Sequence, residues 1–148
     1  MARYLSIHPE DPQPRMLGQA AEILRSGGVV AIPTDSCYAL GCGLGDKDAV
    51  ERIRRIREVD DRHHLTLMCR DLSEIAQFAR VDNAQYRLLK ATTPGSYTFI
   101  LEGTKELPRR VLHPKRKTIG LRVPDHKVAL ALLAELGEPL LTSTLMLP

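Results

Sequence analysis

Apolar residues alternate along this chain between helical spacing and short uninterrupted runs, and this alternation is the strongest constraint on its fold. Between residues 16 and 24 the apolar residues recur at helical spacing, and Gly27 and Gly28 then end the predicted helix. The apolar run 29–32 follows directly and predicts a short, fully buried strand, which Pro33 ends. Helices that alternate with short apolar strands are typical of an α/β sheet covered by helices.

The same alternation continues to the end of the chain. Asp46 is the predicted N-cap of a helix with one apolar face, which carries Ala49, Val50, Ile53 and Ile56. Asp71 and Glu74 form a start that resembles a capping box for a third helix, and Gly137 ends the last one. The remaining predicted elements are helices at 83–91 and 125–136 and strands at 65–69, 97–101, 118–123 and 140–144.

Length and composition predict one globular domain over residues 1–148. No stretch approaches the roughly 20 uninterrupted apolar residues of a membrane helix, and residues 1–13 lack the apolar core of a signal peptide. We therefore expect a cytoplasmic protein with no membrane partner. The apolar ending at 145–148 predicts that the C-terminal end of the domain is missing.

The three cysteines, Cys37, Cys42 and Cys69, show no C-x-x-C pair. His63 and His64 with Cys69 also match the usual zinc spacing poorly. We expect reduced thiols, no metal site and no tightly bound cofactor.

Positive charge is concentrated in two segments, although the net charge is only +3. One segment carries Arg52, Arg54, Arg55, Arg57 and Arg62, and the other carries Lys105, Arg109, Arg110, Lys115, Arg116 and Lys117. Most of these cations are arginine, whose planar guanidinium forms paired hydrogen bonds with phosphate. Such segments are either solvated surface or phosphate contacts, and RNA is the partner that the second alternative predicts.

A polar segment follows the first predicted strand, where α/β sheets commonly bind ligands. Its sequence, from Pro33 to Cys42, contains Thr34, Asp35 and Ser36. These side chains serve either as ligand contacts or as turn formers through local backbone bonds. The chain contains neither a G-x-x-x-x-G-K-[ST] loop nor a G-x-G-x-x-G sequence.

Four motifs stand in order along the chain, at 33–41, 94–98, 118–124 and 139–144, and together they make it similar to the YrdC/YciO family of threonylcarbamoyl-AMP synthase-like proteins. Pro-Thr-Asp-x-x-Tyr-Ala-Leu-Gly at 33–41 resembles the family's Pro-Thr-Glu-Thr-x-Tyr-Gly-Leu, and Pro-Gly-Ser-Tyr-Thr at 94–98 resembles Pro-Gly-Pro-x-Thr. The strand 118–124 resembles Thr-x-x-x-Arg-x-Pro, and 139–144 resembles Pro-Leu-x-Ser-Thr-Ser. The segments 70–74 and 103–110 look most like the YciO branch.

This resemblance implies a twisted mixed sheet flanked by helices, with a concave positive cavity. It also implies a site in which ATP, bicarbonate and L-threonine combine to form the precursor of a tRNA modification, with ATP and Mg as candidate substrate. Carried over by position, the substrate- and nucleotide-binding residues are Thr34, Arg57, Thr118, Arg122, Thr142 and Thr144. The resemblance assigns no catalytic residue.

Two departures from the family pattern bear on catalysis. The family's Lys-x-Arg falls on Arg57 and Val59, and its Ser-x-Asn falls on Thr144 and Met146, which cannot replace an amide. We therefore favour a protein that binds nucleotide and double-stranded or transfer RNA. The residues expected to contact RNA are Arg52, Arg55, Arg62, Lys105, Arg109, Arg110, Lys115, Arg116 and Lys117. An active threonylcarbamoyl-AMP synthase and a remnant domain that serves partner contacts are the alternatives.

Overall fold

The structure, a computed structural model, describes residues 4–35, 37–58 and 64–144. Six strands form one sheet in the order β1-β2-β6-β3-β5-β4. The strands are β1 (Val30–Pro33), β2 (Tyr38–Gly43), β3 (Thr66–Met68), β4 (Phe99–Glu102), β5 (Thr118–Arg122) and β6 (Leu140–Thr144). Only β3 and β5 are parallel among the paired strands described, so the sheet is mixed, as expected.

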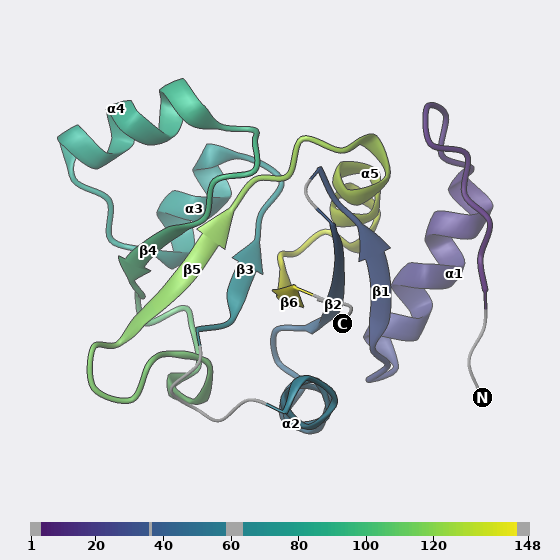
Figure 1. The fold of residues 1–148 in the computed structure, drawn as a ribbon, viewed down its shortest axis with the longest axis horizontal. Coiled ribbons are helices and arrows are strands. Elements are labelled where there is room, and N and C mark those ends of the chain that lie inside the picture. The colour runs from purple at the N-terminus through teal and green to yellow at the C-terminus, as the bar shows by residue number, and fades with distance from the viewer. Residues whose placement is uncertain (1–3, 36, 59–63, 145–148) are drawn as a thin grey trace.

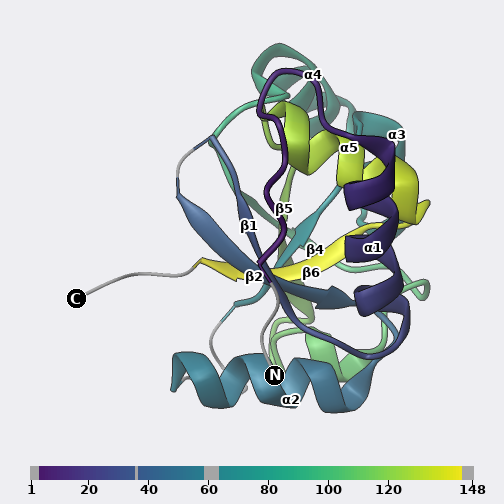
Figure 2. The ribbon, with the colours of Figure 1, turned by 90° about the vertical axis from the view of Figure 1, so that its right-hand side faces the viewer.

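Helices cover both faces of this sheet. They are α1 (Pro14–Arg25), α2 (Lys47–Arg57), α3 (Leu72–Phe78), α4 (Asn83–Thr92) and α5 (Lys127–Leu136), with a short 3-10 turn, η1 (Arg109–Val111), before β5. Leu141, Leu67 and Leu121 are paired across three strands and are fully buried on the face covered by α2 and α3. Leu140 and Met68 point to the opposite face and pack with α1 and α5. Figure 2 shows α1 and α5 side by side.

Local sequence explains the ends of these helices. The Asp46 carboxylate accepts the backbone N–H of Ala49 at 2.9 Å, and Asp71 does the same for Glu74 at 2.9 Å, so both predicted N-caps are confirmed. Gly137 ends α5 in the left-handed conformation, with φ 79°. No helix among the described residues is long and apolar enough to cross a membrane.

The predictions for β1 and β2 need correction. The predicted fully buried strand is an edge strand: β1 pairs with β2 alone, and of its residues only Ile32 is buried. Pro33 fits within β1 because an edge strand has an unpaired side. The polar segment expected as a turn contains β2, a central strand with Ala39 to Cys42 buried. The prediction that Ile56 lies on the apolar face of α2 is also wrong, because Ile56 is 53% exposed.

The cysteines give a first testable result. Burial raises the pKa of the Cys42 thiol to about 12 and also raises that of Cys69, whereas Cys37 is only half-buried. Because the thiolate is the reactive species, iodoacetamide at pH 8 is expected to modify the folded protein at Cys37 and at neither buried thiol. Mass spectrometry of native and urea-unfolded samples checks this. Modified Cys42 or Cys69 in the folded protein would contradict it.

The same pKa shifts set a pH dependence of stability. The ordinary thiol pKa is 9.0, and the folded values lie above it. The contribution of the two buried thiols to the free energy of unfolding is therefore fully present below about pH 9. It is lost as pH rises above that value, because thiols of the unfolded chain lose their protons at lower pH than thiols of the folded chain.

Candidate functional site

Strand register places most of the predicted ligand-binding residues on one face of the sheet. Thr66 of β3 is paired with Thr142 of β6 and with Gly120 of β5, so these three residues share a face. Residues two and four positions apart on a strand point to the same side. The shared face, called here the threonine face, therefore also includes Thr118, Arg122 and Thr144.

Gly120 leaves room for the side chains of Thr66 and Thr98 beside β5. A Cβ atom on Gly120 would lie 2.9 Å from Thr66 Oγ1 and 3.0 Å from Thr98 Cγ2, which is too close for any other residue without a shift. The buried Thr142 hydroxyl donates to the Thr66 carbonyl oxygen at 2.8 Å. The Thr142 hydroxyl proton is thus used within the sheet, whereas Thr144 is exposed at the end of β6.

Thr118, at the start of β5, is held by a histidine that sequence reasoning did not include. His64 Nε2 and Thr118 Oγ1 lie 2.9 Å apart, and the His64 ring stacks on His113 at a centroid distance of 5.2 Å. His113 Nδ1 in turn accepts the backbone N–H groups of Lys115 and Arg116, each at 3.2 Å. These contacts fix the end of the second basic segment beside the threonine face.

Arg57 reaches the end of β6 from the other side of the sheet. Its Nε donates to Ser143 Oγ at 3.2 Å, and Ser143 points away from Thr142 and Thr144 by strand alternation. Ser143 is buried, so this hydrogen bond anchors the carboxyl end of α2 to the sheet. Arg57 of the first basic segment therefore contacts β6 on the face opposite to Thr142 and Thr144.

Arg122 is joined to the loop that connects β1 and β2. Its guanidinium forms an ion pair with Asp35 that leaves both side chains largely buried, at 7% and 15% exposure. The other Asp35 oxygen accepts the backbone N–H of Asp125 at 3.1 Å. Burial lowers the pKa of Arg122 from its ordinary value. The Pro-Thr-Asp motif and the β5 motif, far apart in sequence, thus meet at one point.

Gly95 and Thr34, two more residues of the family motifs, have different roles beside the Asp35–Arg122 ion pair. The Gly95 N–H donates to the Val123 carbonyl at 2.8 Å, which brings the Pro94-Gly95 motif to the end of β5. Thr34 forms a local turn: its N–H donates to the Cys37 carbonyl at 3.0 Å, and its hydroxyl bonds the same residue. For Thr34 the structure thus displays the turn-forming role.

The two basic segments lie against each other at the lower edge of Figure 1. Arg54 Nη2 donates to the Arg110 carbonyl at 3.2 Å, and Arg110 Nη2 donates to the Gly45 carbonyl at 3.0 Å. Arg54 is buried, and it also pairs with Glu51 at 3.3 Å. Arg54 is therefore neither solvated surface nor an available phosphate contact, because its guanidinium links α2 to the segment before β5.

The exposed cations of both segments, among the described residues, are called here the basic surface. They are Arg52 and Arg55 on α2, together with Lys105, Arg109, Lys115, Arg116 and Lys117. Lys117 adjoins Thr118, so this basic surface extends to the edge of the threonine face. Arg110 is half-buried and engaged with Gly45.

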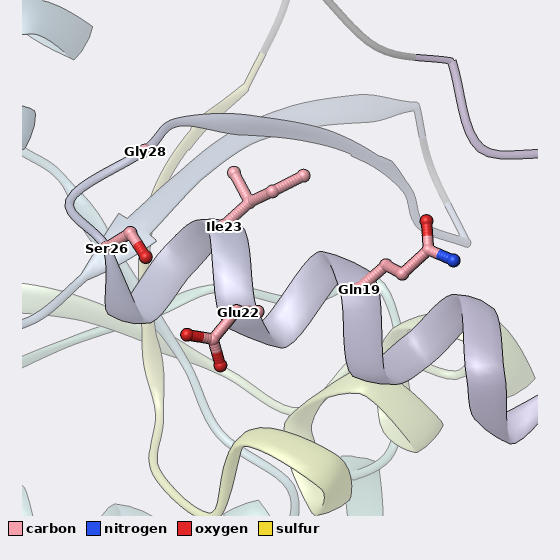
Figure 3. Close-up of a pocket in the computed structure, with 5 residues that line it drawn as sticks. All are labelled: Gln19, Glu22, Ile23, Ser26 and Gly28. Carbon is pink, nitrogen blue, oxygen red and sulfur yellow. The ribbon is translucent and has the colours of Figure 1, made fainter.

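Two hollows lie in the described part of the structure, and no residue of the threonine face lines either of them. One, of about 400 Å³, is lined by Gln19, Glu22, Ile23, Ser26 and Gly28, all on or directly after α1 (Figure 3). The second, of about 460 Å³, is lined by Leu24, Arg25, Gly43, Gly45, Asp46, Lys47, Asp48 and Glu138. Neither includes a predicted ligand-binding residue, so the concave positive cavity stays a prediction. Val59, Arg62 and Met146 lie outside the described residues.

These features define an α/β protein whose mixed sheet presents hydroxyl groups and a buried arginine beside an exposed basic surface. The chain belongs to the Sua5/YciO/YrdC family, whose model, described as telomere recombination, matches residues 22–148. It is 60% identical over 148 residues to the uncharacterized protein YciO of Escherichia coli K12, a match covering 100% of this chain and 72% of that protein. A threonylcarbamoyl-AMP synthase of Chromobacterium violaceum is 33% identical over 137 residues, or 92% of this chain and 70% of the synthase.

Solved structures agree with this assignment. The crystal structure of E. coli YciO matches with a TM-score of 0.97 at 59% identity, covering 100% of this chain and 72% of that one. P. abyssi Sua5 complexed with L-threonine matches with a TM-score of 0.82 at 26% identity, covering 89% of this chain and 39% of that one. The family resemblance and the twisted mixed α/β fold are confirmed, and the family's synthases connect it to tRNA modification.

Proposed function

We propose that this protein binds the phosphates of a nucleotide and of double-stranded or transfer RNA, and that it acts in tRNA modification. The observation that carries the proposal is the contact between two distant basic segments, through Arg54, Arg110 and their backbone partners. Because these contacts bring the cations of the two segments closer together, they raise the positive potential in that region. Such a concentration favours a polyanionic partner.

The absence of aromatic residues from the two basic segments indicates which kind of RNA would bind. The chain has no Trp, four Tyr and two Phe, and none of these aromatic residues lies in the basic segments 52–62 and 105–117. Single-stranded RNA is usually bound by stacking bases on aromatic side chains, which these segments cannot supply. Phosphate contacts guided by shape suit a duplex or a folded RNA better.

The threonine face is the proposed place for the nucleotide and an amino acid. Thr118 and Thr144 offer hydroxyl groups next to the basic surface, and Arg122 offers a guanidinium at the other end of β5. The P. abyssi Sua5 structure with L-threonine supports an amino acid as a ligand of this fold. Because Lys117 directly precedes Thr118, a nucleotide bound there would place its phosphates close to a cation.

A second candidate, an active threonylcarbamoyl-AMP synthase, is favoured by one contact. The Asp35–Arg122 ion pair joins two of the family's motifs into one site. Against a high rate stand Val59 and Met146, where the family has a cation and an amide. Loss of one charged contact to a polyphosphate costs roughly 2–5 kcal/mol. We therefore propose binding as the main activity and a rate far below that of an ordinary synthase.

Neutralising the basic surface is expected to weaken RNA binding without affecting ATP binding. In the variant Arg109→Gln/Lys115→Gln/Arg116→Gln three exposed cations are lost, and the log–log salt slope for a 20-base-pair duplex should become less negative by about 3. Arg110 is excluded because its guanidinium holds the Gly45 carbonyl. Fluorescence anisotropy across a salt series measures the slope, and calorimetry measures ATP affinity.

The matched control removes three exposed cations from the other end of the molecule. Arg80→Gln/Arg87→Gln/Lys90→Gln changes residues on or next to α4, which lies far from α2 in Figure 1. This control should bind duplex RNA as the wild type does. Equal losses in both variants would show that net charge, rather than the basic surface, governs binding.

A further inference from the structure

Two histidines stack on each other where the basic surface meets the threonine face. The parallel pairing of β3 with β5 brings His64, two residues before the paired Thr66, beside Thr118. The rings of His64 and His113 lie 5.2 Å apart between centroids, with 24° between their planes. Both side chains are half-buried, so water can still exchange protons with them. Histidine ordinarily changes its charge at about pH 6.5, which makes this pair a candidate for a change of charge on ligand binding.

The hydrogen bonds of His113 require an unprotonated Nδ1. This nitrogen accepts the backbone N–H groups of Lys115 and Arg116, each at 3.2 Å. An imidazolium carries a proton on both ring nitrogens and accepts no hydrogen bond. A proton on Nδ1 would therefore break both bonds and loosen the turn that carries two cations of the basic surface. His113 thus takes part in the stack as a neutral ring.

His64 can take up a proton and keep its bond to Thr118. Its Nε2 lies 2.9 Å from Thr118 Oγ1. A protonated His64 donates to this hydroxyl oxygen, and the Thr118 hydroxyl proton is then left to donate to another group. Two imidazolium rings in this stack would repel each other, so the pair carries one proton at most. That proton belongs on His64.

The surrounding charges decide when His64 becomes protonated. The three cations at 115–117 lie in the turn that begins at the stacked ring, and they oppose a further positive charge. Glu102 lies opposite the start of β5 and favours such a charge, but Arg80 lies 3.3 Å from Glu102 and offsets it. Residues 59–63, which directly precede His64, lie outside the described residues. A bound phosphate would cancel the charge of the cations and add negative charge, so it would favour protonation of His64.

We propose that binding of a phosphate group at Thr118 takes up one proton from solvent on His64. His64 acts through Thr118 as a positioning residue: as an imidazolium it turns the hydroxyl proton of Thr118 toward the phosphate. The inference rests on the proposed function, because it requires a phosphate where the basic surface meets the threonine face. It goes further in assigning a role to a residue outside the four family motifs and in linking phosphate binding to pH.

Affinities at pH 6 and pH 8 test the inference, measured for a 20-base-pair duplex RNA by fluorescence anisotropy and for ATP by calorimetry. For one of the two ligands, wild-type affinity should be at least about 3-fold higher at pH 6. His64→Gln keeps a polar group beside Thr118 and does not titrate, so it should lower this ratio at least about 2-fold. Because ATP itself binds protons in this range, the difference between wild type and variant reports the proton on the protein. The ligand that shows the difference identifies the source of the phosphate.

Two further variants separate His64 from the other histidines. His8→Gln removes an exposed histidine from the N-terminal segment, which lies beside α1 and far from the turn before β5 in Figure 1, and it should keep the wild-type ratio. His113→Asn keeps an acceptor for the two backbone N–H groups, and its ratio should stay above that of His64→Gln. Thermal melting at both pH values should show that the variants are folded.

The outcomes distinguish the inference from the proposed function. A wild-type ratio near one for both ligands, or a ratio that His64→Gln keeps, overturns the inference and leaves phosphate binding intact. A ratio lost in His113→Asn and kept in His64→Gln also overturns it, because the proton would then be on the other ring. Absence of binding of either ligand at both pH values overturns the proposed function and the inference with it.

Discussion

Arg122→Ala is expected to lower the free energy of unfolding by about 3 kcal/mol and to abolish measurable L-threonine binding. The substitution removes the counter-ion of Asp35, whose carboxylate is only 15% exposed, and it opens space at the end of β5. Removal of one partner of a buried pair is costly because the other charge stays buried without compensation. Urea denaturation followed by circular dichroism measures the stability, and calorimetry below the transition measures binding.

An exposed ion pair provides the comparison. Arg80 and Glu102 lie 3.3 Å apart with 68% and 58% of their side chains exposed, so Arg80→Ala should cost less than about 1 kcal/mol. The double variant Asp35→Asn/Arg122→Ala should recover part of the lost stability, because no unpaired charge remains. If Arg122→Ala and Arg80→Ala had similar stabilities, the Asp35–Arg122 pair would not be a buried charge pair of the kind described.

Most elements of the fold could be predicted from local signals because those signals act within a few residues. Asp46 and Asp71 cap their helices through contacts three residues away, and Gly137 ends α5 through its own backbone conformation. The strand β2 could not be predicted, since it contains no β-branched residue and Tyr38, at its start, is its one aromatic residue. Its strand conformation depends on hydrogen bonds to β1 and β6, which lie on either side of it.

The edge position of β1 depends on the same tertiary information. A run of four apolar residues reads as a fully buried strand when its neighbours are unknown. In the sheet β1 has one partner only, which leaves Ala31 exposed and tolerates Pro33. Strand order is a property of the whole chain, so periodicity within one segment cannot supply it.

The sequence motifs indicated which residues belong to the candidate site, but they did not indicate which of these residues contact one another. Motif order indicated Thr118, Arg122 and Thr142, and strand register places them on one face. Asp35 and Arg122 are 87 residues apart in the sequence, and no periodicity or motif spacing predicts a contact over such a separation. The signal that could have indicated Asp35 is its position beside Thr34, at the end of a strand.

The sequence alone does not show which cations of a basic segment are exposed and which bind the protein's own backbone. Arg54 and Arg110 differ from their neighbours because each guanidinium donates to a backbone carbonyl across a tertiary contact. The side chain of Arg54 follows Val50 and Ile53 toward the core, a direction that a simple division of α2 into apolar and basic faces missed. Arg54, which was not expected to contact RNA, and Arg110, which was, thus hold together the two segments that carry the other cations.

The salt dependence of duplex RNA binding tests the central proposal most directly. If the basic surface contacts about four to six phosphates, the wild-type log–log slope of affinity against salt should lie near −4 to −5. Affinity should then fall by roughly 10²- to 10³-fold between 50 and 200 mM salt, with little dependence on RNA sequence. A slope near zero, or no binding at 50 mM salt, would contradict the proposal and leave the basic surface as solvated side chains.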